Sequence, residues 1–146
     1  MSPPAYLLDT SLLSELVKRT PHPTVVTWVD ARDEDTLYIS VITLGELQKG
    51  VSKLPTSERK EALQSWLTQD LVQRFGGRIL PVDSAVALAW GTLQGEAERS
   101  GSKLPVVDAL IAATASVHNL TVVTRNVRDL QRCGVPVVNP WQPPTS

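Results

Sequence analysis

The stretch YLLDTSLLSELV, residues 6–17, shows how this chain passes from strand to helix. Tyr6 to Leu8 form a short apolar run that ends at Asp9, which is typical of a buried strand. From Ser11 to Val17 the apolar residues then recur at helical spacing. The stretch therefore predicts a strand, a turn that carries an acid, and an amphipathic helix.

The same alternation of strand and helix continues along the chain. Further predicted strands cover residues 37–41, 79–82, 121–124 and 136–138. Predicted helices cover residues 25–29, 43–51 and 57–75, then a segment capped by Asp83 that runs towards Arg99, and residues 106–117. Strands that alternate with helices predict an α/β fold, with a central, mostly parallel sheet flanked by helices on both faces.

Length and composition predict one domain. The chain has 146 residues, of which 42% are hydrophobic, enough to supply a buried core. We therefore expect a single domain over residues 1–146, with its core at about residues 5–140. No apolar run approaches the roughly 20 residues of a membrane span. We expect a cytoplasmic protein with no membrane partner.

Charge and cysteine content exclude several classes of site. The net charge is −1, from 14 basic and 15 acidic residues, so no broad basic face is implied. A nucleic acid would have to be bound locally, by a few Arg and Lys or by metal ions that carboxylates hold. Cys133 is the only cysteine, which excludes an intrachain disulfide and a multi-cysteine zinc site. We expect its side chain to be a small buried hydrophobe.

Several acids follow the predicted strands. Asp9 ends the first strand, Glu46 follows the second, Asp108 lies near the start of the apolar helix, and Asn126 and Asp129 follow the strand at 121–124. Parallel sheets gather the carboxyl ends of their strands at one edge, so these side chains are expected to converge. Converging carboxylates repel one another unless a cation compensates their charge. Oxygen ligands suit Mg²⁺ or Mn²⁺, which can support hydrolysis of a phosphodiester.

Each of these residues also has a simpler interpretation. Asp9 could be an ordinary helix N-cap, and Glu46 a solvated helix residue. Asn126 and Asp129 could be turn and cap residues. Asp108 lies among apolar neighbours, where an ionised carboxylate needs a capping role, a partner or a cation. The sequence pattern alone leaves these alternatives open.

Four blocks of sequence carry a more specific resemblance. They are YLLDTS (6–11), SVITLGEL (40–47), PVVDALIAATA (105–115) and VTRNVRDL (123–130). In this order and with these intervening lengths, they resemble PIN-domain ribonucleases, and in particular the VapC-type toxins of type II toxin–antitoxin systems. The resemblance extends from Tyr6 to about Pro140.

The resemblance implies an activity and a site. It implies a metal-dependent endoribonuclease, a hydrolase whose cutting of RNA blocks translation and growth. Asp9, Glu46 and Asp108 are then the ligands of Mg²⁺ or Mn²⁺. Thr10 or Ser11 would supply a hydroxyl near the site, in contact with the substrate.

The fourth acidic position departs from the family pattern. Many members carry an acid where this chain has Asn126, and Asp129 is the other acid of that block, so either residue could complete the catalytic set. Arg125 could contact a substrate phosphate, since a guanidinium is always charged. The implied partners are an RNA substrate (a tRNA or an rRNA), a cognate antitoxin protein and a second copy of the chain in a homodimer.

Two other classes of protein are weaker interpretations. Phosphotransfer enzymes of the haloacid-dehalogenase or receiver type also place an Asp after the first strand. This chain has Ser11 where the former would have a second Asp, and no lysine follows a later strand at the place where either scheme needs one. A non-catalytic PIN-fold module that binds RNA or protein is the main alternative. Such a module would have no need of three mutually repelling acids.

Overall fold

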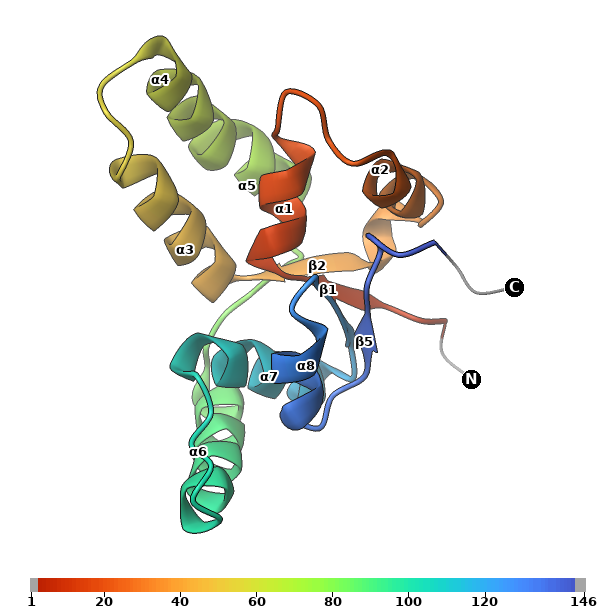
Figure 1. Cartoon of the computed structure of the whole chain (residues 1–146), viewed down its shortest axis with the longest axis vertical. Coiled ribbons are helices and arrows are strands. Elements are labelled where there is room, and N and C mark those ends of the chain that lie inside the picture. The colour runs from red at the N-terminus through yellow and green to blue at the C-terminus, as the bar shows by residue number, and fades with distance from the viewer. Residues whose placement is uncertain (1–2, 144–146) are drawn as a thin grey trace.

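The computed structural model describes residues 3–143 and contains one parallel sheet. Within that range five strands lie in the order β3-β2-β1-β4-β5, and every neighbouring pair is parallel (Figure 1). The strands are β1 (Tyr6–Leu8), β2 (Leu37–Ser40), β3 (Ile79–Leu80), β4 (Thr121–Val123) and β5 (Val137–Val138). The predicted α/β class is confirmed.

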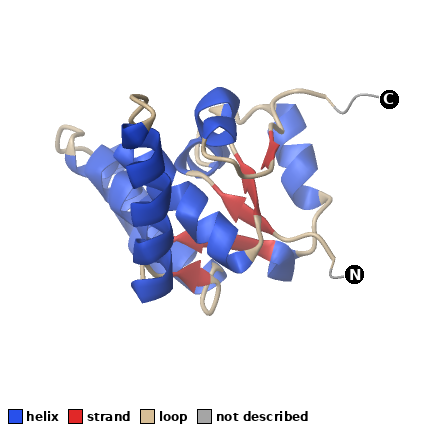
Figure 2. Cartoon of the chain, turned by 90° about the horizontal axis from the view of Figure 1, so that it is seen from below, coloured by secondary structure: helices blue, strands red, loops and turns tan. Residues whose placement is uncertain are grey.

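Helices cover both faces of the sheet. One face carries α1 (Thr10–Leu16), α2 (Pro23–Asp30), α3 (Val41–Ser52), α4 (Glu58–Ser65) and α5 (Val72–Arg74). The other carries α6 (Ser84–Arg99), α7 (Val106–His118) and α8 (Val127–Arg132). Figure 1 shows the two groups on opposite sides of the strands, and Figure 2 shows the strands running side by side among the helices. The predicted helices on both faces are confirmed.

The central position of β1 in the sheet explains why its sequence is apolar without a break. Successive side chains of a strand point to opposite faces. Leu8 is fully buried in the core on the α1–α5 face, and Leu7 is fully buried in the core on the α6–α8 face. In β4, Val123 is buried in the core on the α1–α5 face and Val122 in the core on the α6–α8 face. Full burial of each such side chain contributes roughly 1.5–3 kcal/mol to folding.

Two predicted strands are shorter in the structure. The strand predicted at 37–41 ends at Ser40, because the Ser40 hydroxyl accepts a hydrogen bond from the backbone N–H of Ile42 (3.0 Å) and caps α3. Val41 therefore begins a helix. The strand predicted at 79–82 ends at Leu80. Pro81 follows it and has no N–H to donate to a neighbouring strand.

The long helix predicted at 57–75 is continuous but not uniform. Its beginning is confirmed, since the Ser57 hydroxyl accepts a hydrogen bond from the Lys60 backbone N–H (3.1 Å). Between α4 and α5, residues Trp66–Leu71 form a π-helix. The Thr68 hydroxyl donates to the backbone oxygen of Gln64 (2.9 Å), the acceptor that an α-helix would give to the Thr68 amide. This bond does not by itself cause the wider turn, since the Thr114 hydroxyl donates to the Leu110 oxygen in the same way (2.8 Å) within the regular helix α7.

The predicted cap at Asp83 and the predicted burial of Cys133 are also confirmed. The Asp83 carboxylate caps α6 by accepting a hydrogen bond from the Val86 backbone N–H (3.0 Å). Cys133 is a buried free thiol that packs in the α6–α8 core. Over residues 3–143, no helix combines the length and the apolar character that crossing a membrane requires.

Gln94 joins α6 to the segment that precedes α7. It is buried, its side-chain amide donates to the Leu104 backbone oxygen (2.9 Å), and its side-chain oxygen accepts from the Leu104 N–H (2.9 Å). Gln94→Ala leaves both backbone groups unpaired, so we expect urea unfolding to show a loss of about 2–4 kcal/mol. Thr92→Ala, at an exposed position of the same helix, is the control. Equal unfolding midpoints for the two variants would contradict the prediction.

Candidate functional site

The carboxyl ends of three strands meet at one edge of the sheet. β1 lies between β2 and β4, so the residue after β1 and the residue after β4 are neighbours. From β1 the chain passes to β2 and β3 on one side of β1, and it then returns to β4 on the other side of β1. The strand order therefore reverses at β1. Parallel sheets bind ligands at such a reversal of strand order. Asp9 follows β1 and Thr124 follows β4 at this edge.

Asp9 is held in place by the strand next to it. Its backbone N–H donates to the Val123 oxygen (3.0 Å), and its carboxylate accepts a hydrogen bond from the Thr124 hydroxyl (2.7 Å). The Ser11 hydroxyl lies 3.4 Å from the same carboxylate oxygen. Asp9 occupies the N-cap position of α1, but its side chain makes no capping bond. The simple capping interpretation is therefore wrong for this side chain.

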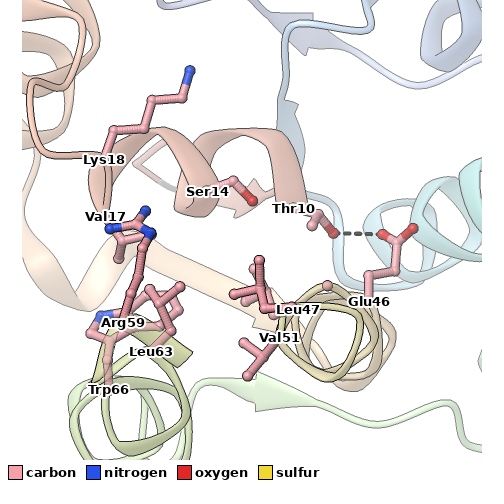
Figure 3. Close-up of a pocket in the computed structure, with 12 residues that line it drawn as sticks. Thr10, Ser14, Val17, Lys18, Glu46, Leu47, Val51, Arg59, Leu63 and Trp66 are labelled. Atoms are coloured by element: carbon pink, nitrogen blue, oxygen red, sulfur yellow. Dashed lines mark hydrogen bonds between the residues drawn. The ribbon is translucent and has the colours of Figure 1, made fainter. Parts of the chain in front are cut away.

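Glu46 is joined to the residue that follows Asp9. The Thr10 hydroxyl donates to the Glu46 carboxylate (2.5 Å), which links the start of α1 to α3 (Figure 3). Thr43, one turn earlier in α3, is fully buried, and its hydroxyl lies 3.5 Å from that of Thr10. Glu46 itself is half-buried. It is therefore not the freely solvated helix residue of the simpler interpretation.

Asp108 lies in the first turn of α7 and faces the other acids. Its carboxylate accepts a hydrogen bond from the Asn126 side-chain amide (3.3 Å). The pKa of Asp108 is raised, chiefly by burial and then by the negative charges of Asp9, Asp129 and Glu46, against a small lowering by Asn126. Three acids from three other segments are thus close enough to act on the Asp108 carboxyl group.

These four acids have no positive partner among residues 3–143. The ion pairs found in that range join Glu15 to Lys18, and Glu34 to Arg74 and Arg78. An edge that gathers acids without a counter-charge favours a bound cation, since a cation removes their mutual repulsion. The donors are all oxygens, which suits Mg²⁺ or Mn²⁺ better than zinc.

The acids do not form a closed metal cage. In the part of the chain that the structure describes, no group of three Asp, Glu, His or Cys side chains is arranged to hold one ion. Each predicted ligand instead accepts a hydrogen bond from a neutral side chain: Asp9 from Thr124, Glu46 from Thr10, and Asp108 from Asn126. Mg²⁺ usually keeps several waters and needs only one or two carboxylates. The donor chemistry therefore fits such an ion, and the three-ligand set stays a prediction.

Sequence reasoning overlooked Thr124. This residue is fully buried, donates to Asp9, and accepts a hydrogen bond from the Asn126 backbone N–H (3.0 Å). It therefore fixes the turn after β4 relative to the end of β1. The signal was available, because a hydroxyl side chain directly after a predicted strand occupies the same kind of position as Asp9.

An apolar pocket opens beside the site. It has a volume of about 280 Å³ and lies between α1, α3 and the helical segment that begins with α4. Figure 3 shows Thr10 and Glu46 joined at one end of this pocket and Leu63 and Trp66 at the other. Glu46 thus borders a surface that is largely hydrophobic.

The comparisons with known proteins agree with this geometry. The model of the PIN domain family matches residues 6–134. The chain belongs to the PIN-domain family. All four sequence blocks lie inside the matched range, and the family resemblance drawn from them is confirmed.

Relatives match this PIN domain over nearly its whole length. The VapC ribonuclease Y4jK of Sinorhizobium fredii is 36% identical, over 94% of this chain and 98% of that protein. A solved structure of FitAB bound to an IR36 DNA fragment has a TM-score of 0.88 and 35% identity, over 96% of this chain and 98% of the other. A toxin–antitoxin complex from Klebsiella pneumoniae has a TM-score of 0.69 and 28% identity, over 93% and 98% of the two chains.

Proposed function

We propose that this PIN domain is a metal-dependent endoribonuclease that acts as the toxin of a toxin–antitoxin pair, blocking translation and growth. The observation that carries the proposal is the edge where the charges of Asp9, Glu46 and Asp129 act on Asp108, with no ion pair to a basic residue within residues 3–143. Its likeness to a protein named as a VapC ribonuclease supports RNA as the substrate.

The proposed cofactor is Mg²⁺ or Mn²⁺, with Asp9, Glu46 and Asp108 as the residues that would hold it. Such an ion, when bound, activates water for attack on a phosphodiester and neutralises charge on the phosphate. The chain contributes the placement of the carboxylates. Thr124 orients Asp9 and Thr10 orients Glu46, so neither carboxylate has to be ordered when the substrate arrives.

Asn126 and Asp129 have different proposed roles. Asn126 is neutral and donates to Asp108, so it orients that carboxylate. Asp129 adds a fourth negative charge whose effect reaches Asp108. This division supports both residues in the catalytic set, with Asp129 in place of the acid that many family members have at the position of Asn126.

Three further residues are proposed to contact the substrate. Ser11 lies between Asp9 and the turn after β4, since its hydroxyl is 3.4 Å from the Asp9 carboxylate and accepts from the Arg125 backbone N–H (3.4 Å). Thr10 borders the apolar pocket. Arg125 is exposed beside the acids and offers a permanent positive charge to a phosphate.

The partners follow from the same proposal. A related chain is solved in a toxin–antitoxin complex, which supports a cognate antitoxin for this one. A basic antitoxin side chain that reached the acids would compete with the metal ion for their charge, which gives a physical route to inhibition. A tRNA and an rRNA both stay open as the target, and the homodimer and the cytoplasmic location stay predictions.

Cleavage of total cellular RNA by the purified, antitoxin-free protein tests the proposal. We expect discrete cuts with Mg²⁺ or Mn²⁺, mapped by end sequencing, and no cuts with a chelator. Asp70→Asn, which removes an exposed acid of the π-helix, should cut like the wild type. A folded, metal-loaded protein that cuts no RNA would support the alternative of a non-catalytic binding module.

A further inference from the structure

The segment after β5 packs against the helices on the α1–α5 face of the sheet. Beyond β5 the chain turns back towards the face that carries α1 and α2 (Figure 1). The Trp141 side chain packs against the core on that face. Its backbone N–H donates to the Asn139 side-chain oxygen (2.9 Å), which closes the turn that precedes it. Trp141 is thus placed against α1, although 126 residues separate it from Glu15 in that helix.

A buried carboxylate anchors the Trp141 ring. The indole N–H donates to Glu15 (3.2 Å), which is 5% exposed. Glu15 also accepts from the Lys18 ammonium (3.0 Å) and from the His22 backbone N–H (3.1 Å). The pKa of Glu15 is lowered, first by the bond to Lys18 and also by the bonds from His22 and Trp141, against the opposing effect of burial. Glu15 therefore stays ionised at neutral pH and holds three segments together.

The anchored ring faces Arg125. The guanidinium of Arg125 lies over the indole ring of Trp141, 5.1 Å from its centre. At the other end of the residue, the backbone N–H of Arg125 donates to Ser11, whose hydroxyl lies against Asp9. Arg125 is thus attached to the acidic edge through its backbone and to the indole through its side chain.

This arrangement leaves the donors of Arg125 free. A guanidinium that stacks on an aromatic face keeps the N–H groups of its edge for other partners. Within residues 3–143, Arg125 takes part in no ion pair. The contact with Trp141 therefore holds the positive charge of Arg125 against the indole ring, while its hydrogen-bonding edge remains open to a ligand.

We propose that Trp141 is a positioning residue, which Glu15 anchors and which holds the Arg125 guanidinium where it binds a phosphate of the RNA backbone. The inference rests on the proposed function, since it names a contact to the RNA substrate. The acidic edge repels a phosphate backbone and the chain as a whole is not basic, so one fixed cation in the turn that follows β4 has a large share in local RNA binding.

A double-mutant cycle on RNA binding tests the proposal. The probe is a fluorescein-labelled single-stranded RNA of mixed sequence, bound in chelator and followed by anisotropy at several salt concentrations. We expect Trp141→Leu to weaken binding about three- to fivefold. It should also reduce the slope of log Kd against log salt by about 0.7, the value for one phosphate contact to a single strand.

Variants of the two residues should show that Trp141 acts through Arg125. Arg125→Ala should reduce the salt slope by the same amount, and the double variant should bind no more weakly than Arg125→Ala alone. Trp141→Phe keeps an aromatic face and should restore most of the binding that Trp141→Leu loses. Arg99→Ala removes an equal charge at the end of α6, on the opposite face, and should bind like the wild type.

Several results would overturn the inference. Additive losses in the double variant would show that Trp141 does not act through Arg125, as would an unchanged salt slope in Trp141→Leu. If Trp141→Leu does not fold, the cycle is repeated with Glu15→Gln, which removes the charge that anchors the indole N–H and keeps the ring itself, and additivity there has the same meaning. A wild type that cuts RNA while these variants bind normally refutes only this inference, whereas a wild type that neither binds nor cuts RNA refutes the proposed function as well.

Discussion

Replacing Asp9 by Asn is expected to reduce RNA cleavage about 10²- to 10³-fold, because a catalytic metal ion typically contributes several kcal/mol through charge stabilisation. Asn keeps the shape of Asp and can still accept the hydrogen bond from Thr124, so the turn after β1 should stay in place. What it removes is the negative charge of a side chain that is 9% exposed. The measurement is single-turnover cleavage with excess enzyme and Mn²⁺.

The control for this prediction separates charge at the site from charge in general. Asp70→Asn makes the same chemical change at an exposed position of the π-helix and should leave the cleavage rate within about twofold of the wild type. Thermal melting of both variants checks that each is folded. Cleavage by Asp9→Asn at the wild-type rate would show that the Asp9 charge has no part in the reaction.

The fold was largely predictable because its strands and helices differ in apolar pattern. Leu7 and Leu8 are both buried, one on each face, and this is why β1 appears in the sequence as an unbroken apolar run. Boundaries were harder to predict. Val41 continues a β-branched run, yet the Ser40 hydroxyl caps a helix there, and a single hydrogen bond of this kind outweighs the strand preference of the next residue.

The π-helix at Trp66–Leu71 could not be predicted from apolar spacing. Its side chains recur three or four residues apart, as in an α-helix, and Leu67 and Leu71 are both buried. The difference lies in the backbone hydrogen bonds, and the bond from the Thr68 hydroxyl to the Gln64 carbonyl does not reveal it, since Thr114 makes the same bond to Leu110 in the regular helix α7. Threonine is common in helices without this effect, so the residue type alone does not reveal it.

The candidate site was predictable only in part. That Asp9, Glu46 and Asp108 gather at one edge follows from the rule that parallel strands end together. That each carboxylate is held by a neutral neighbour does not follow from it, since these partners depend on side-chain geometry. Glu15 and Trp141 show the same limit, because 126 residues separate them and no local pattern pairs them.

Asp108→Asn is expected to stabilise the protein in the presence of a chelator, raising Tm by about 2–6 °C. Burial and three neighbouring acids raise the pKa of Asp108, so its proton is bound more tightly in the folded state than in the unfolded state. Ionisation of Asp108 therefore costs folding free energy. This cost is absent at a pH below the unfolded pKa of about 3.9 and is fully present above the raised folded pKa.

The expected difference in Tm between Asp108→Asn and the wild type thus increases as pH rises and disappears in acid. Melting curves measured across pH in chelator should show this directly, and Asn126→Asp should behave in the opposite way, because it adds a negative charge beside Asp108 and removes a donor.

Added Mn²⁺ should reverse the order of stability of the three proteins, since a ligand at a hundred times its Kd stabilises by about 2.7 kcal/mol. The wild type and Asn126→Asp should gain from it and Asp108→Asn should gain least. If all three proteins gain equally from Mn²⁺, then Asp108 does not hold the ion, and its raised pKa reflects burial and repulsion alone.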